Sequence, residues 1–320
     1  MSGGGSAPQF GERADLGPDD VCYRHPDRPS LTLCQRCGNT ICTQCQTVSA
    51  VGVLCPDCVR EAKPSTGQRM ARSSRATARR VGDRGTPVVT YAVMAVCGLV
   101  FVAQLLSNWL GENEVTHALW YAPVYSLPDW VSALRYSDVA FEPWRMLTSV
   151  FTHSTGFLFH VLFNMYALWL FGRHLEQVIG RAAFLTLYLF SGLGGSLGVM
   201  LWAYADPSTI GVPTVGASGA IFGVMAATLI AHRAAGVSIV SLAVLVAINF
   251  AIGLLPGAAI SWQAHLGGMV VGAATMGLLL ATRGPRRKAS RMLVLVLLGA
   301  VLVALGALYW VVLPSVPWLA

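Results

Sequence analysis

The feature that most constrains this chain is a series of long apolar stretches that begins near residue 87. They fall at about 87–109, 157–175, 182–205, 218–232, 237–255, 261–281 and 292–313. At 1.5 Å per residue, most of them are long enough to cross a hydrocarbon core of about 30 Å, and the fourth is short. Only 12% of the residues are charged, against about 25% in soluble domains, so we expect an all-α integral membrane protein.

The charged residues between these stretches predict how the chain is oriented. Basic residues flank alternate ends of the stretches, at 60–84, Arg173 and Arg181, Arg233, and 283–291. Because positive charge stays inside, seven spans place the N-terminus in the cytoplasm and the C-terminus outside. The basic stretch 60–84 could bind nucleic acid, but its place before an apolar span favours a role in topology or contact with anionic lipid. No apolar run precedes residue 87, so we expect no cleavable signal peptide.

Three polar side chains interrupt three separate apolar stretches at similar depth. Counted from the basic residues that end their stretches, His160, Ser218 and His265 lie about 20–27 Å along a helix axis, in the outer half of the bilayer. Polar groups at that depth are costly unless they face one another or water. The pattern therefore predicts that these side chains converge.

Ser218 and His265 suit a nucleophile and its base. Ser218 follows a Gly- and Pro-containing segment and is expected at a helix start, where free N–H groups favour an oxyanion. His265 precedes Gly268 and Gly272, a spacing that lets a neighbouring helix approach closely. No Asp or Glu lies in the core of any stretch, so we infer a Ser–His dyad without a carboxylate. Ser218 could instead be an N-cap or a small residue in a helix contact, and His265 a structural histidine.

His160 and Asn164 supply the remaining candidates for this site. They are four residues apart in "FHVLFNM", so they share one helix face. Both can donate hydrogen bonds to a tetrahedral oxyanion, together with the backbone N–H of Ser218. Alternatively, they hold helices together or bind water.

Four strings in this region resemble the rhomboid family of intramembrane serine proteases. They are "EPWRMLTSVFTH" (142–153), "HVLFN" (160–164), "GASG" (216–219) and "AHLGGMVVG" (264–272), in the order that the family has. The resemblance covers residues 87–281 and implies a six-helix core with Ser218 as nucleophile and His265 as base. It also implies that His160 and Asn164 line the oxyanion site, and that Trp144 and Arg145 belong to the first extracellular loop. The stretch 292–313 then adds a seventh helix, a 6+1 arrangement.

The same resemblance implies the activity. Members cleave membrane-anchored proteins in or near their transmembrane segments, with substrates entering from lipid and no cofactor for catalysis. One departure is visible, because Phe222 stands where many bacterial members have a tyrosine packed on the catalytic histidine; a phenyl ring can still stack on His265. The alternative function is a non-catalytic rhomboid-like binder that acts in membrane-protein quality control.

A second, separate motif lies ahead of the first apolar stretch. Four pairs of metal-ligand residues, each with a two-residue gap, supply eight ligands: Cys22, His25, Cys34, Cys37, Cys42, Cys45, Cys55 and Cys58. This set is enough for two tetrahedral zinc ions, and a cytoplasmic location argues against disulfides. The pattern resembles B-box zinc fingers, which implies interleaved ligation: Cys22, His25, Cys42 and Cys45 on one ion and the other four on the second. Spacing alone leaves sequential pairing open.

The sequence therefore predicts five segments. They are a disordered N-terminus (1–20), a B-box-like zinc module (21–60), a basic linker (61–86), the protease core (87–281), and a seventh transmembrane helix with the C-terminus (282–320). We expect two structural Zn²⁺ ions and a cytoplasmic protein partner for the zinc module, in preference to nucleic acid. The expected location is a bacterial plasma membrane.

Overall fold

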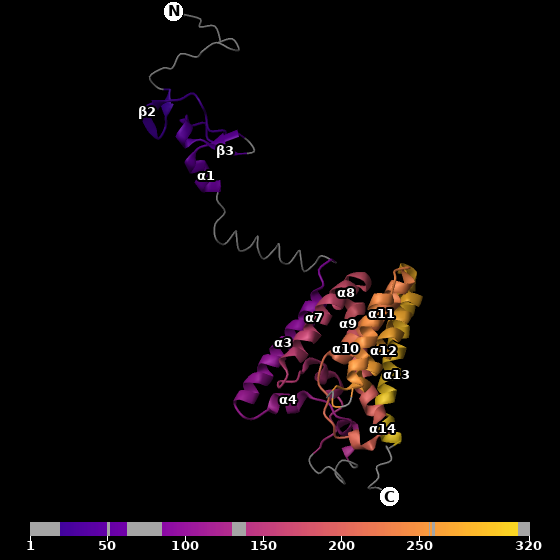
Figure 1. The fold of residues 1–320 in the computed structure, drawn as a ribbon. Coiled ribbons are helices and arrows are strands. Elements are labelled where there is room, and N and C mark those ends of the chain that lie inside the picture. The colour runs from indigo at the N-terminus through magenta and orange to yellow at the C-terminus, as the bar shows by residue number, and fades with distance from the viewer. Residues whose placement is uncertain are drawn as a thin grey trace, which may run out of the picture. The chain divides into compact units, whose positions relative to one another are not determined.

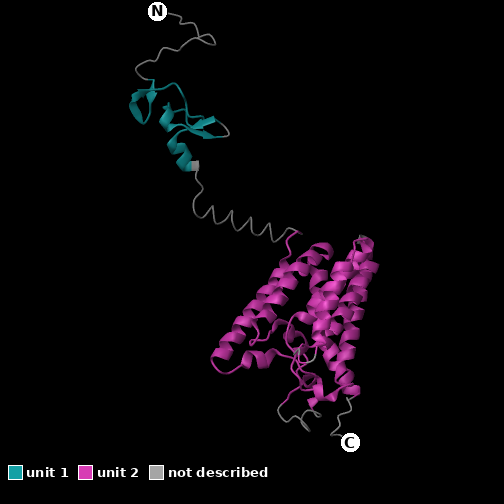
Figure 2. Ribbon diagram, viewed as in Figure 1, with its two compact units in different colours: residues 1–80 teal, residues 81–320 magenta. Residues whose placement is uncertain are grey.

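The computed structural model describes residues 20–49, 52–62, 85–129, 139–255, 257 and 260–312. The chain divides into two compact units, residues 1–80 and 81–320, which are coloured separately in Figure 2. The expected disordered N-terminus and nearly all of the basic linker lie outside the described residues, so neither prediction is tested.

The first unit is small and has little regular structure. Its elements are β1 (Val21–Cys22), β2 (His25–Pro29), a 3₁₀ turn (Thr43–Cys45), β3 (Thr47–Ser49), β4 (Gly52–Leu54) and α1 (Pro56–Ala62). Strand β1 pairs antiparallel with β2, and β3 pairs antiparallel with β4. Among the described residues of this unit, the buried hydrophobic cluster consists of Ile41 and six cysteines, so its core consists mostly of potential metal ligands.

The second unit is a bundle of helices (Figure 1). The long helices are α3 (Val88–Trp109), α7 (Leu158–Ala167), α8 (Arg173–Ile179), α9 (Arg181–Trp202), α10 (Ser218–Ala234), α11 (Val240–Gly253), α12 (Trp262–Ala281) and α13 (Lys288–Gly306). A π-helical turn, Leu168–Gly172, joins α7 to α8 without a break. Shorter helices, α4 (Glu114–Leu119), α6 (Arg145–Thr148) and α14 (Leu308–Val311), lie in the connections and at the C-terminal end.

The helices agree with the predicted apolar stretches to within a few residues. Among the described residues, four helical segments are long and apolar enough to cross a membrane: Val88–Trp109, Arg181–Trp202, Trp262–Ala281 and Lys288–Val311. Helices α10 and α11 are apolar but shorter. The helix predicted at 157–175 runs on through α8 to Ile179, because the π-helical turn does not interrupt it.

Glycines bring α9, α10 and α12 into backbone contact. A Cβ atom added at Gly268 of α12 would overlap the carbonyl oxygen of Gly219 in α10, and one at Gly272 would overlap the backbone of Gly223. The neighbouring Gly267 lies similarly close to the backbone of Gly194 in α9. Helices whose backbones approach this closely are typical of membrane proteins, where small residues replace the hydrophobic effect as the basis of packing. The expected close approach at Gly268 and Gly272 is confirmed.

A buried carboxylate ties the first helix to the bundle. Glu176 of α8 is 2% exposed, and its two oxygens accept the backbone N–H groups of Val89 and Thr90 at 2.9 and 2.7 Å. The Thr90 hydroxyl donates to it as well, at 2.7 Å. Glu176 therefore satisfies N–H groups at the start of α3, and its negative charge complements the positive end of that helix.

We expect Gly268→Ala to destabilise the bundle strongly and Gly277→Ala, in the same helix, to have little effect. The added methyl group at Gly268 meets a carbonyl oxygen, whereas at Gly277 it meets nothing within 4 Å. Overpacking costs about 1–3 kcal/mol or more, while Ala in an open helix position is neutral or stabilising by up to about 1 kcal/mol. Thermal unfolding in detergent measures both. Equal melting temperatures for the two variants would contradict the packing.

Candidate active site and metal clusters

Ser218 is the first residue of α10, as predicted. The chain reaches it through Gly216, whose φ of +123° is a backbone conformation that side chains other than glycine rarely adopt. The backbone N–H of Gly216 donates to the carbonyl oxygen of Ser149 at 3.0 Å, which fixes the segment just before the helix. Because the first N–H groups of a helix have no intrahelical partner, the Ser218 side chain lies beside free donors.

His265 of α12 meets Ser218 directly. The imidazole Nε2 lies 2.9 Å from the Ser218 hydroxyl oxygen, although 47 residues separate the two in sequence. The His265 side chain is 6% exposed, and its Nδ1 has no hydrogen-bond partner among the described residues. Among the described residues, no carboxylate forms a hydrogen bond with this imidazole.

Phe222 packs on the imidazole ring of His265 and restricts its orientation. Its ring stacks on that of His265, with centroids 4.1 Å apart and an angle of 21° between the planes. Phe222 is four residues after Ser218 in α10, so the hydroxyl and the phenyl ring lie on the same helix face and meet the same histidine. The prediction that Phe222 can stack on His265 is confirmed.

His160 of α7 lies next to Gly216. A Cβ atom added at Gly216 would be 2.9 Å from the Nε2 of His160 and 3.7 Å from the Ser218 hydroxyl oxygen, so both groups border the same small volume. The backbone N–H of Ser154 donates to the Nδ1 of His160 at 3.2 Å. A neutral imidazole that accepts at Nδ1 carries its proton on Nε2, and that proton is available to an acceptor beside Ser218.

Asn164 is buried one turn further along α7. Its side-chain Nδ2 donates to the backbone carbonyl oxygen of His160 at 2.7 Å. One of its two amide hydrogens is therefore used within its own helix, and the second is left for another acceptor. The structure thus agrees with the expected common face of His160 and Asn164, with His160 placed at Gly216 and Asn164 bonded to its own helix.

Gln104 of α3 lies behind the site and was not predicted from the sequence. It is fully buried and pairs with both backbone groups of His153, accepting from the N–H at 3.0 Å and donating to the carbonyl oxygen at 2.9 Å. The ring of His153 in turn lies 5.4 Å from that of His160. A glutamine in the middle of an apolar stretch was the signal that could have identified it, because an amide at that depth needs a partner.

Trp144 and Arg145 lie in the connection before α7. Trp144 is exposed, whereas Arg145 is buried and pairs with Glu142. The Arg145 guanidinium also lies 4.1 Å from the centroid of the Tyr125 ring and donates to the carbonyl oxygen of His117. Arg145 thus holds parts of the connection between α3 and α7 together. None of these contacts involves Ser218 or His265.

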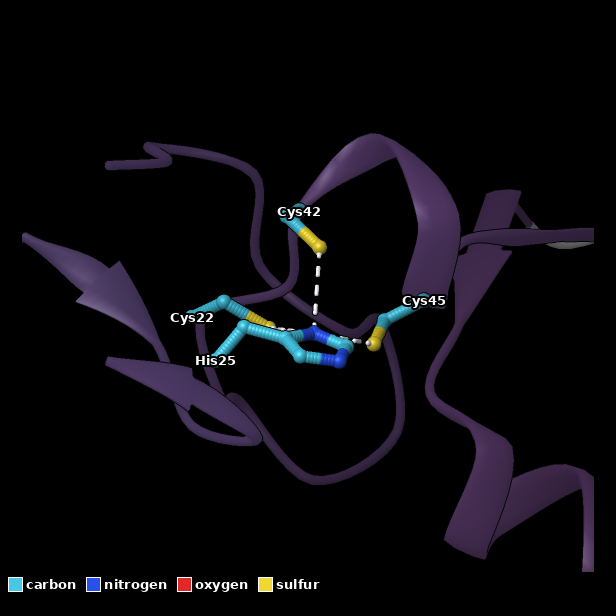
Figure 3. Close-up of side chains that lie close together, drawn as sticks. All are labelled: Cys22, His25, Cys42 and Cys45. Carbon is cyan, nitrogen blue, oxygen red and sulfur yellow. Dashed lines mark hydrogen bonds between the residues drawn. The ribbon is translucent and has the colours of Figure 1, made fainter. Parts of the chain in front are cut away.

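The first metal-ligand cluster lies in the N-terminal unit (Figure 3). Cys22, His25, Cys42 and Cys45 have their ligand atoms within 4.8 Å of one another. The three sulfur atoms lie 3.8, 3.5 and 3.4 Å from the Nδ1 of His25, in that order of residues. One ring nitrogen cannot form three such hydrogen bonds at once, so the arrangement fits four ligands around a common centre.

The second cluster has four thiols. Cys34, Cys37, Cys55 and Cys58 also lie within 4.8 Å of one another, and the sulfur atoms of Cys37 and Cys55 are 3.7 Å apart. Both clusters could hold a metal ion, and the grouping is the interleaved one that the B-box resemblance implied. Cys97, in contrast, is buried in the helical core and takes part in neither cluster.

A polar contact links the residues next to the two clusters. The hydroxyl of Tyr23, beside Cys22, donates to the carboxylate of Asp57, beside Cys58, at 2.7 Å. This hydrogen bond lowers the pKa of the Asp57 carboxyl, and the nearby Arg24 and Arg60 lower it further. The hydrogen bond between Tyr23 and Asp57 therefore connects the residue after β1 to α1.

Comparison with known proteins finds relatives of the helical unit. Residues 140–283 match the rhomboid domain family. The chain is 39% identical over 140 residues to RHOMBOID-like protein 1 of Arabidopsis thaliana, covering 41% of this chain and 33% of the relative. It is 29% identical over 277 residues to rhomboid protease GluP of Bacillus subtilis (79% and 48%). It is 27% identical over 208 residues to rhomboid protease AarA of Providencia stuartii (57% and 68%).

The alignments cover only part of the relatives. The chain spans about a third to a half of the first curated relatives that it matches. The matched domain contains all four residues of the predicted site, from His160 to His265. Residues 140–283 thus resemble a rhomboid domain, and the relatives of this chain include named rhomboid proteases.

Proposed function

We propose that this protein is an intramembrane serine endopeptidase that uses a Ser218–His265 dyad. The observation that carries the proposal is the 2.9 Å distance between the Ser218 hydroxyl oxygen and the His265 Nε2, across two helices whose backbones touch. This distance is within the range in which an imidazole can take a hydroxyl proton. The named proteases among the relatives support the same reaction class.

The first half of the reaction forms an acyl-enzyme. His265 takes the Ser218 proton at Nε2 while the serine oxygen attacks the carbonyl carbon of the scissile peptide bond. The resulting imidazolium then donates the proton to the leaving amine. Stacking on Phe222 keeps the imidazole in plane during both transfers, a role that a carboxylate has in a triad. In the second half, His265 takes a proton from a water molecule whose oxygen attacks the acyl carbon. The ester bond to Ser218 then breaks, the imidazolium returns the proton to the serine oxygen, and the new carboxyl end leaves.

The negative charge on the carbonyl oxygen needs donors. The free N–H groups at the start of α10 supply one set, and the Nε2–H of His160 supplies another beside Gly216. Asn164 contributes its second amide hydrogen or holds His160 in place. A donor that is aimed in advance at a developing oxyanion contributes roughly 3–4 kcal/mol to transition-state stabilisation.

The substrates we propose are membrane-anchored proteins that enter sideways from lipid and are cut in or near a transmembrane segment. Helices α3, α7–α8, α9, α10, α11 and α12 would form the six-helix core, and α13 the seventh span. The charge pattern supports a cytoplasmic N-terminus and an extracytoplasmic C-terminus. We place the protein in a bacterial plasma membrane.

A non-catalytic binder of membrane proteins is the second candidate. The plant rhomboid-like proteins among the relatives, whose names state no activity, support this candidate. The two candidates differ in one property, because only an enzyme needs a serine that reacts with electrophiles. A fluorophosphonate probe therefore separates them, since a binder without an activated serine stays unlabelled.

For the N-terminal unit we propose two structural zinc ions. A tetrahedral site with Zn–S of about 2.3 Å and Zn–N of about 2.0–2.1 Å has N···S edges of about 3.6 Å and S···S edges of about 3.8 Å. The N···S distances of 3.4–3.8 Å around His25 and the S···S distance of 3.7 Å at Cys37 match these edges. Since the unit has little other core, metal binding would supply most of its folding energy. We propose a cytoplasmic protein as its partner.

Ser218→Ala should abolish cleavage of a model transmembrane substrate by the purified protein in detergent. The expected loss of kcat is at least ~10³-fold, because catalysis by such a unit fails when its nucleophile is removed. Ser208→Ala is the matched control, since Ser208 is exposed and donates to Asp206 of its own turn. Undiminished cleavage by Ser218→Ala, or the same loss in Ser208→Ala, would refute the dyad.

Metal analysis should find two zinc ions in each full-length chain. His25→Ala should remove one of them, and Cys58→Ser the other, because the two residues belong to different clusters. Plasma mass spectrometry of the purified protein measures both losses. A chain that carries no zinc would contradict both sites. A double variant His25→Ala, Cys45→Ser that loses both ions would contradict the interleaved grouping, because these two residues belong to one cluster.

Deletion of residues 1–60 should leave intrinsic catalysis largely intact. The helical unit has its own core and its own site, with Ser218 and His265 both inside it. Turnover of one detergent-solubilised substrate by the full chain and by the truncated chain tests this expectation. A hundred-fold loss would instead show that the zinc module is coupled to the active site.

A further inference from the structure

The two C-terminal helices extend beyond the matched domain, yet they complete the core of a loop near the site. The match ends at residue 283, before α13 and α14. The loop in question joins α3 to α6 (residues 110–144, described over 110–129 and 139–144), and Figure 1 shows its helix α4 and α14 at the same end of the bundle. Leu302 of α13 and Tyr309 of α14 are buried in one cluster with side chains of this loop and of α9 with its C-cap: Tyr121, Ala122, Val124, Leu127, Leu197, Met200 and Ala203.

Tyr309 is the centre of this contact. Its side chain is fully buried, and its hydroxyl donates to the carbonyl oxygen of Met200 near the end of α9. Its ring packs edge-to-face on Tyr204, with centroids 5.0 Å apart. The hydroxyl of Tyr204 donates back to the carbonyl oxygen of Val312 at 2.5 Å. Two hydrogen bonds in opposite directions therefore fix the C-terminal segment to the end of α9.

Trp310 contacts the loop from a second side. Its ring packs edge-to-face on Phe141, with centroids 5.0 Å apart and an angle of 78° between the planes. The next residue, Glu142, donates its N–H to the carbonyl oxygen of Tyr125 at 2.9 Å and pairs with Arg145. Phe141 is thus held at the point where the loop leads into α6.

The loop, in turn, holds the segment that leads to Ser218. Tyr121 and Thr214 exchange both backbone hydrogen bonds, at 3.1 and 2.6 Å. The N–H of Val124 donates to the carbonyl oxygen of Ile210 at 2.9 Å. Thr214 is only four residues before Ser218, with the left-handed Gly216 between them. A displacement of the loop would therefore be passed to the turn that sets the serine.

We propose that Tyr309 and Trp310 are positioning residues for Ser218, acting through the α3–α6 loop and the segment 210–217. Neither residue touches the proposed reacting atoms. They fill the core of the loop from outside the rhomboid domain, so the seventh helix has a role in setting the site. This inference rests on the proposed function for its activity readout, but not for its structural readout.

The test measures two quantities on the full chain in detergent. The first is the rate at which a fluorophosphonate labels Ser218, and the second is amide hydrogen exchange along the chain. Tyr309→Ala should slow labelling about tenfold, because a small misplacement of a reacting group costs one to two orders of magnitude. It should also accelerate exchange at least about tenfold in peptides covering 119–127 and 208–217, while peptides of α12 keep their wild-type rates.

Two control variants define the effect. Tyr309→Phe keeps the ring in the core and should label within about threefold of the wild-type rate. Val303→Ala removes a side chain that is 67% exposed on α13 and should change neither quantity. If Tyr309→Ala does not fold, Trp310→Ala decides the question through faster exchange at 139–146, since its ring is about half exposed.

Several outcomes would overturn the proposal. Wild-type labelling and wild-type exchange in Tyr309→Ala would show that the loop does not depend on α14. Faster exchange in all helices alike would show general destabilisation instead of positioning. If the wild-type chain is never labelled, the proposed function fails, whereas the exchange measurement still decides whether the C-terminal helices hold the loop.

Discussion

The backbone contact between α10 and α12 is the constraint on which the rest of the helical unit depends. Gly268 and Gly272 of α12 lie against Gly219 and Gly223 of α10 without room for a Cβ atom. Because the axes are so close, a short serine side chain reaches an imidazole on the neighbouring helix. The same contact places Phe222 over that imidazole. Packing and the proposed chemistry are therefore consequences of one glycine pattern.

The two units solve the problem of stability in different ways. The helical unit has no metal-ligand cluster among its described residues and is held by close helix packing, by the Glu176 cap on α3 and by the loop that binds Arg145. Among its described residues, the N-terminal unit has a very small apolar core, in which Ile41 is buried together with thiols of the two clusters. Helix packing therefore stabilises the helical unit, whereas we attribute the stability of the N-terminal unit to metal binding.

Much of this arrangement could be predicted from local sequence. Apolar length predicts the helices, the two-residue gaps predict the metal ligands, and the GASG and AHLGG strings predict which helices carry Ser218 and His265. Other features could not be predicted, because they depend on partners far away in the chain. Glu176 caps a helix that begins 88 residues earlier, Gln104 pairs with the backbone of His153, and Tyr309 completes a core made by another loop. Each is a buried polar group whose partner is set by the tertiary fold.

The central claim is that Ser218 and His265 act together beside donors from α10 and His160. An experimental structure of the protein after reaction with a fluorophosphonate tests it most directly. We predict a covalent bond to the Ser218 oxygen, with a phosphonyl oxygen within hydrogen-bond distance of an N–H group at the start of α10 and of the His160 Nε2. An adduct on another residue, or Ser218 and His265 on surfaces that face apart, would contradict it.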